Sequence, residues 1–222
     1  MIAALTDSIN RILDLGGPVV LLLCALSVLV LAVILYKLWQ FVQAGVGRHR
    51  ALQDAIAAWD AGDPARARQH LDRSRSYLRP VIEMAMHPHP DSPRLEAEAE
   101  TRFATLEKGF RLLDSVAQLA PLLGLFGTVL GMISAFQALQ QAGSQVDPSI
   151  LAGGIWVALL TTAVGLAVAM PTALILSWLE SRMDAERVLA HKALRTILAP
   201  SGQAVTTPEN AAQNAGTGAA YA

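Results

Sequence analysis

Three threonines within two long uncharged segments are the residues of this chain best suited to chemistry. Thr128 belongs to the segment Ser115–Val146, and Thr161 and Thr162 belong to Pro148–Leu179. Each hydroxyl can donate and accept a hydrogen bond, so several of them around a centre could form a path for protons or cations. Intramembrane acids are the usual proton carriers, and these segments contain none. The alternative is that the threonines bond to the carbonyl one turn earlier and only support helix packing.

Small residues accompany the threonines at helical spacing. Gly124, Gly127 and Gly131 lie three and four residues apart and share one helix face, and Gly165 belongs to a similar face of the second segment. Such faces allow helices to approach closely, so we expect them to pack between copies of the chain. The predicted packing residues are Gly124, Gly127, Gly131, Gly165, Pro121 and Pro171.

The elements that must position these residues are membrane-spanning helices. Asp147 is the sole ionisable residue between Asp114 and Glu180, so the two segments form a hairpin of uncharged arms. About 20 helical residues cross the roughly 30 Å core of a bilayer, and each arm exceeds that length. A third apolar run extends from Gly17 to about Val42. The composition, 53% hydrophobic and 16% charged, agrees with a membrane protein.

The positive charges predict the orientation of the spans. Of 17 Lys and Arg residues, 11 lie from Arg48 to Arg111 and four from Arg182 onward. Positive residues stay on the cytoplasmic side, which places the N-terminus and the Asp147 corner outside and the C-terminus inside. The predicted segments are a periplasmic amphipathic segment 1–16, membrane helix 17–42, a cytoplasmic helical region 43–113, membrane helix 114–141, a periplasmic turn 142–149, membrane helix 150–179, a cytoplasmic helical extension 180–199 and a disordered tail 200–222.

The ends and polar parts complete the prediction of an all-α integral membrane protein. Segment 1–16 lacks the basic start of a signal peptide, so it is either a surface helix or a frayed terminus. Two short helices should be separated at Gly62-Asp63-Pro64, and one unbroken helix should run from Arg94 to Gln140. The last helix should continue to about Leu198. Two of the three membrane helices therefore extend into a cytoplasmic helical bundle.

Several classes of function are excluded by residue types. Cys24 is a single cysteine within an apolar span, and the prolines of His87-Pro88-His89-Pro90 favour a connector over a metal site. We expect no metal, no cofactor and no nucleic-acid partner. Nucleotide-binding and hydrolytic motifs are absent from the sequence, so we expect no enzyme. A secondary transporter would need broken helices and internal repeats, and three spans show neither.

Two runs of residues resemble the MotA/TolQ/ExbB proton-channel family. They are Leu119–Ile133, LAPLLGLFGTVLGMI, and Gly154–Pro171, GIWVALLTTAVGLAVAMP. The three spans are similar to the ExbB and TolQ branches, and the sequence is most similar to ExbB. The resemblance implies a homopentamer in the bacterial inner membrane that encloses the single spans of two copies of an ExbD-like partner, whose aspartate carries protons. It implies that Thr128, Thr162, Thr161 and Val157 line the pore, and that proton motive force drives a TonB-like protein serving outer-membrane receptors.

One position departs from the family pattern. Val157 stands where the family commonly has glutamate, and a valine can neither titrate nor hold a cation. We expect conduction to survive, with a weaker attraction for cations at the outer mouth. Two alternatives stay open beside the ExbB-like function: a TolQ-like subunit of the Tol-Pal envelope system, and a membrane scaffold that does not conduct.

Overall fold

The computed structural model describes residues 2–142 and 148–201, and within these ranges it contains helices and no strands. It confirms an all-α fold with three helices long and apolar enough to cross a membrane. The helices are α1 (Ile2–Ala44), α2 (Arg50–Asp60), α3 (Pro64–Asp72), α4 (Arg79–Ala85), α5 (Ser92–Glu107), α6 (Phe110–Ala142) and α7 (Pro148–Leu198). The chain forms two compact units, one of residues 1–38 and 108–180 and one of residues 39–107 and 181–222.

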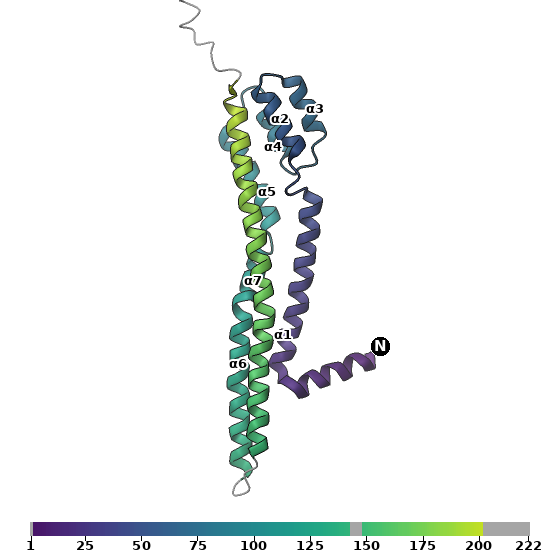
Figure 1. Cartoon of the computed structure of the whole chain (residues 1–222), viewed down its shortest axis with the longest axis vertical. Helices are drawn as coiled ribbons and strands as arrows, with labels where there is room; N and C mark the ends of the chain where they lie inside the picture. Colours follow the sequence, from purple (N-terminus) through teal and green to yellow (C-terminus); the bar gives the residue numbers. More distant parts are fainter. Residues whose placement is uncertain (1, 143–147, 202–222) are drawn as a thin grey trace, which may run out of the picture. The chain divides into compact units, whose positions relative to one another are not determined.

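The first unit holds the apolar helices. In it α6 and α7 lie side by side (Figure 1), and their contacts pair rising residue numbers on α6 with falling numbers on α7, so the two helices are antiparallel. Many large apolar side chains of this unit point outward, as expected where lipid or protein neighbours replace water. They include Leu22, Leu31, Leu119, Leu122, Phe126, Trp156, Leu159, Leu174 and Trp178.

A kink divides α1 near its start. Gly17 has φ 68° and ψ −171°, outside the helical region, and Pro18 follows it. Glycine adopts positive φ without the steric penalty of a Cβ, and proline lacks the N–H that an unbroken helix would use. The kink therefore separates the helical segment 2–16 from the apolar part that begins at Gly17. The amphipathic character of segment 1–16 stays a prediction.

The predicted unbroken helix from Arg94 to Gln140 is wrong. Helix α5 ends at Glu107 and α6 begins at Phe110, because Gly109 takes φ 96°. Lys37 of α1 packs near the start of α6, where its Nζ lies 5.7 Å from the centre of the Phe110 ring. Lys37 is 1% exposed, so it is buried against aromatic rings rather than extended to the membrane surface. The break between α5 and α6 was not predicted, because a single glycine in a helical pattern is usually tolerated within a helix.

The second unit contains α2 to α5 and the end of α7. The predicted break at Gly62-Asp63-Pro64 is confirmed: Gly62 has φ 79°, and the Asp63 side chain caps α3 by accepting a hydrogen bond from the Arg66 N–H at 2.9 Å. Pro64 occupies the first turn, where its missing N–H costs nothing. The core is a set of buried apolar residues that includes Leu52, Ala67, Leu71, Val81, Ile82, Leu95, Phe103, Leu106, Met183, Leu194 and Ile197.

Two predicted features fall partly outside the described residues. Most of the periplasmic turn, including Asp147, lies within residues 143–147, and the predicted disordered tail lies almost entirely within residues 202–222. The continuation of the last helix to Leu198 is confirmed by α7, which runs for 51 residues.

Candidate functional site

Glycines bring α6 and α7 into close contact. A Cβ added at Gly165 would lie 2.5 Å from the carbonyl oxygen of Ala120, and one at Gly124 would lie 2.9 Å from the carbonyl oxygen of Thr161. At Gly127 a Cβ would lie 2.8 Å from the Thr161 hydroxyl oxygen. These faces are therefore occupied by the chain's own two helices. The expectation that they pack between copies is wrong, because spacing along one helix identifies a face but not its partner.

Thr161 joins the two helices. Its side chain is 1% exposed, and its hydroxyl oxygen lies 2.7 Å from the carbonyl oxygen of Ala158 and 3.1 Å from that of Gly124. The first contact lies within α7, and the second crosses to α6. A hydroxyl buried in this way needs an acceptor, and here both nearby acceptors are backbone carbonyls. The Thr161 hydroxyl therefore links α7 to α6 through its contacts with the carbonyls of both helices.

Thr162 differs from the two other threonines. Its hydroxyl oxygen is shielded from solvent and has no hydrogen-bond partner within the described part of the chain. The Thr128 hydroxyl, in contrast, donates to the carbonyl oxygen of Leu125 at 2.6 Å, the local bond that packing alone would favour. A buried hydroxyl without a partner costs free energy, and such a group in a folded protein calls for an explanation.

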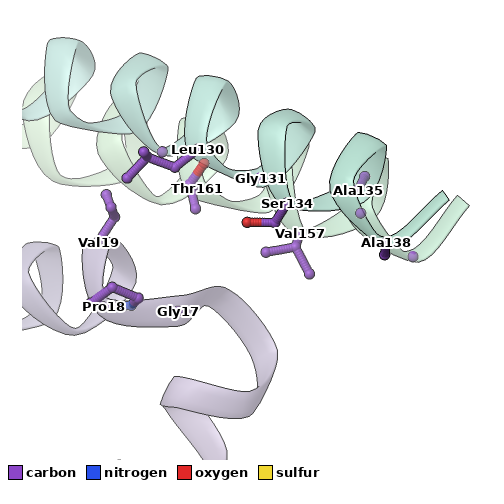
Figure 2. A pocket seen from close by; sticks show the side chains of 13 residues that line it. Gly17, Pro18, Val19, Leu130, Gly131, Ser134, Ala135, Ala138, Val157 and Thr161 are labelled. Carbon is purple, nitrogen blue, oxygen red and sulfur yellow. The ribbon is translucent and has the colours of Figure 1, made fainter. Parts of the chain in front are cut away.

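A cavity of about 340 Å³ lies on one side of the α6–α7 pair, next to the kink of α1. Figure 2 shows Ser134 of α6 and Val157 of α7 beside one another at this cavity, with Pro18 and Val19 of α1 across from the helix pair. The lining contains no ionisable side chain: it consists of Gly17, Pro18, Val19, Gly127, Leu130, Gly131, Ser134, Ala135, Ala138, Gly153, Gly154, Val157 and Thr161. Val157 thus lies at the cavity wall, which also contains the hydroxyls of Ser134 and of Thr161, one helical turn further along α7 (Figure 2).

The two predicted packing prolines stand inside unbroken helices. Pro121 lies within α6 and Pro171 within α7. Each removes one helical N–H, so the carbonyl four residues earlier loses its usual donor. Pro121 follows Ala120, whose carbonyl faces Gly165, whereas Pro171 is exposed. The two prolines therefore have different surroundings, and only Pro121 borders the glycine contact.

The second unit contains a buried polar network that sequence reasoning missed. The His49 Nε2 lies 2.7 Å from a carboxylate oxygen of Glu186, and their side chains are 8% and 4% exposed. The same carboxylate accepts hydrogen bonds from the Gly47 N–H at 2.9 Å and from the Tyr77 hydroxyl at 2.9 Å. Burial, and then the neighbouring Glu186 carboxylate, raise the pKa of the Tyr77 phenol, so it remains a donor. His49 and Glu186 are 137 positions apart, and no local signal in the sequence links them.

Two other features of the site could in part have been predicted from the sequence. Gly154, which the predicted packing residues do not include, also lies in the helix contact, because a Cβ there would collide with the Ala135 side chain. The Gly16-Gly17-Pro18 run is a turn signal that could have indicated the kink beside the cavity.

Comparison with known proteins identifies the family of this chain. A sequence model of the MotA/TolQ/ExbB proton channel family matches residues 65–191. The biopolymer transport protein ExbB-like 1 of Synechocystis is 36% identical over 165 residues, which cover 70% of this chain and 64% of that protein. The biopolymer transport protein exbB1 of Vibrio cholerae is 31% identical over 152 residues, covering 66% of this chain and 67% of that protein.

The Tol-Pal system protein TolQ of Haemophilus influenzae is also similar, with 41% identity over 81 residues that cover 36% of this chain and 35% of that protein. The chain thus spans about two thirds of the length of the two ExbB-type relatives. Proteins of this family are channel and transport proteins rather than enzymes, and the three apolar helices agree with a multi-pass inner-membrane protein. The chain belongs to the MotA/TolQ/ExbB proton channel family, and ExbB-type members match it over about two thirds of its length.

Proposed function

We propose that this chain is the pore-forming subunit of a proton-driven inner-membrane motor of the ExbB type. Five copies enclose the single membrane span of an ExbD-like partner, and the partner's aspartate carries the protons. The motor converts proton motive force into work on a TonB-like protein. The N-terminus faces the periplasm and the C-terminus faces the cytoplasm, as the distribution of Lys and Arg favours.

The observation that carries the proposal is the Thr162 hydroxyl, which is buried and has no hydrogen-bond partner among residues 2–142 and 148–201. The uncharged arms of the hairpin contain no acid that could carry a proton, so an acid must come from outside the chain. If the Thr162 side chain turns its hydroxyl out of this shielded position, a carboxyl group of a partner would both satisfy Thr162 and supply the titrating group. We assign Thr128 a smaller role in the pore than Thr162, because its hydroxyl already donates to the Leu125 carbonyl. We assign Thr161 a structural role in the pore wall, because its hydroxyl donates to the Ala158 carbonyl.

Protonation of the partner's aspartate would change its bond with Thr162. A carboxylate accepts a hydrogen bond from the hydroxyl, whereas a carboxylic acid can also donate one. Each proton that binds or leaves thus changes which copy of Thr162 holds the partner best. Five such sites around the partner cannot all be satisfied at once, which favours rotation of one ring within the other.

Proton flux into liposomes tests this function. The chain is reconstituted with its single-span partner, alone, and with the partner's aspartate replaced by asparagine. We expect flux only from the complete, unmutated pair. Thr162→Val should abolish flux while leaving the complex assembled, because valine has nearly the shape of threonine without its hydroxyl.

A scaffold would give a different result, since it should tolerate Thr162→Val and Thr128→Ala without loss of function in cells. Val157→Glu tests the effect of valine at the position where the family commonly has glutamate. It should strengthen the attraction of the pore for cations, but proton flux should not require it. Flux that is very low until Val157→Glu restores it would count against this view.

A TolQ-like function is the second candidate, favoured by the local identity with the Haemophilus protein. It predicts the same flux but a different partner. Complementation separates the two: an ExbB-type subunit should restore uptake of iron chelates, and a TolQ-type subunit should restore outer-membrane integrity.

A further inference from the structure

Three exposed arginines lie in or next to the loop that follows α1. Arg48 is in the loop, Arg75 precedes α4, and Arg182 is on α7. All three belong to the second unit, and none forms an ion pair with an acidic side chain of the described residues. Unpaired guanidinium groups are suited to bind phosphate oxygens through planar, paired N–H donors.

The backbone around the arginines is fixed by the buried network. The Gly47 N–H donates to Glu186, which stands one helical turn after Arg182, so Arg182 comes to lie against Gly47. A Cβ at Gly47 would collide with the Arg182 guanidinium. On the other side of the loop, the Tyr77 N–H donates to the Ala44 carbonyl at 3.2 Å. A Cβ at Gly45 would lie 3.1 Å from the Arg75 carbonyl oxygen.

The Glu186 carboxylate does not neutralise this cluster by direct pairing. Its oxygens are engaged by the Gly47 N–H, the Tyr77 hydroxyl and the His49 ring, and its side chain is 4% exposed. The three guanidinium groups remain on the outside of the network.

Arg48 and Arg182 follow shortly after the ends of two apolar stretches of the chain. The apolar part of α1, Gly17–Ala44, has 28 residues, which span about 42 Å at 1.5 Å per residue. A bilayer with its headgroup regions is about 40–45 Å thick, so the loop with Arg48 begins where the headgroups are. On α7 the uncharged stretch ends at Leu179, and Arg182 follows about 4.5 Å further along the helix.

We propose that Arg48, Arg75 and Arg182 form a binding site for the phosphate of an anionic phospholipid, such as phosphatidylglycerol. Clusters of Lys and Arg next to membrane spans attract anionic headgroups. The lipid is favoured over a soluble phosphate because Arg48 and Arg182 come within four residues of the ends of two stretches apolar enough to cross a membrane. The site does not depend on proton conduction or on which side of the membrane the loop occupies.

Native mass spectrometry of the full-length chain in detergent tests the site. The purified chain is titrated with phosphatidylglycerol and, separately, with phosphatidylcholine, and bound lipids are counted. We expect phosphatidylglycerol to bind more tightly. Each Arg→Gln change should weaken its binding about fivefold, and the triple variant on the order of a hundredfold.

Arg195→Gln is the matched control, because Arg195 is an exposed, unpaired arginine 13 residues further along α7, about 20 Å away. It should bind phosphatidylglycerol as the unmodified chain does. The triple Arg→Lys variant should retain most of the binding, because it keeps the positive charge. A small decrease is expected, because lysine lacks the paired N–H donors of arginine.

Three results would overturn the proposal. The first is unchanged phosphatidylglycerol binding by the triple Arg→Gln variant, or by Arg182→Gln alone should the triple variant not fold. The second is equal binding of phosphatidylcholine and phosphatidylglycerol by the unmodified chain. The third is complete displacement of the lipid by millimolar inorganic phosphate, which would make the site a soluble-phosphate site. Retention of phosphatidylglycerol under millimolar phosphate supports a lipid site.

Discussion

Substitution of Gly165 by alanine tests the packing of α6 on α7 most directly. A Cβ at Gly165 would lie 2.5 Å from the Ala120 carbonyl oxygen and 3.2 Å from the Gly124 Cα. Both neighbours are backbone atoms, so no side chain can rotate away. The helices must separate by about 0.5 Å to reach the 3.0 Å that real Cβ contacts keep.

The expected cost follows from two opposing terms. Overpacking a close contact costs about 1–3 kcal/mol, whereas Gly→Ala in a helix gains up to about 1 kcal/mol. Gly153 provides the matched control, since it lies in the same helix and a Cβ there would meet nothing within 4 Å. Gly153→Ala should therefore show the gain alone. We expect Gly165→Ala to be about 1–3 kcal/mol less stable than Gly153→Ala.

The assay is equilibrium unfolding of the purified chain, without a partner, in mixed micelles of a mild detergent and SDS, followed by circular dichroism. Dilute protein keeps contacts between copies from contributing. Equal free energies of unfolding for Gly165→Ala and Gly153→Ala would refute the reasoning. In that case the helix pair is either looser than the structure shows or able to shift without cost.

Three further substitutions have defined outcomes. Glu186→Ala should destabilise the second unit by about 3–5 kcal/mol because it leaves His49, the Gly47 N–H and the Tyr77 hydroxyl without their buried partner, whereas Asp72→Ala, which removes the exposed pair with Arg79, should cost at most about 1 kcal/mol; limited proteolysis against denaturant measures both. Thr161→Val should cost about 1 kcal/mol through loss of the hydroxyl contacts, while Thr162→Val should be neutral or stabilising in the isolated chain, a difference visible in the same micelle titration. Trp59→Phe should cost about 1 kcal/mol, because the indole N–H donates to the Ile197 carbonyl at 3.2 Å, and an unchanged midpoint of thermal unfolding would contradict this.

The apolar helices and several of their ends could be predicted because their signals are local. An uncharged stretch longer than a bilayer is thick permits few structures other than a spanning helix, and Gly62-Asp63-Pro64 combines a positive φ, a capping carboxylate and a proline in three positions. The break at Gly109 was missed because one glycine in a helical pattern is usually tolerated, and its φ is fixed by tertiary structure.

The site was predictable in its residue types but not in its pairings. Thr161 and Thr162 are adjacent, so they differ in direction by about 100° around α7. Which of them faces α6 depends on the rotation of the helix, and that rotation is set by the contacts of Gly124 and Gly165. The sequence therefore identifies a threonine pair, whereas the structure distinguishes the bonded hydroxyl from the one without a partner.

The bond between His49 and Glu186 has a consequence for biosynthesis. A ribosome adds about 5–20 residues per second, so the 137 positions between these residues take roughly 7–27 s to synthesise. During that time Gly47 and Tyr77 have been made, but their acceptor has not. The nascent loop must stay hydrated until the last helix is almost finished. A chain that terminates before Glu186 lacks the acceptor for the Gly47 N–H and the Tyr77 hydroxyl, so its loop cannot close in this way.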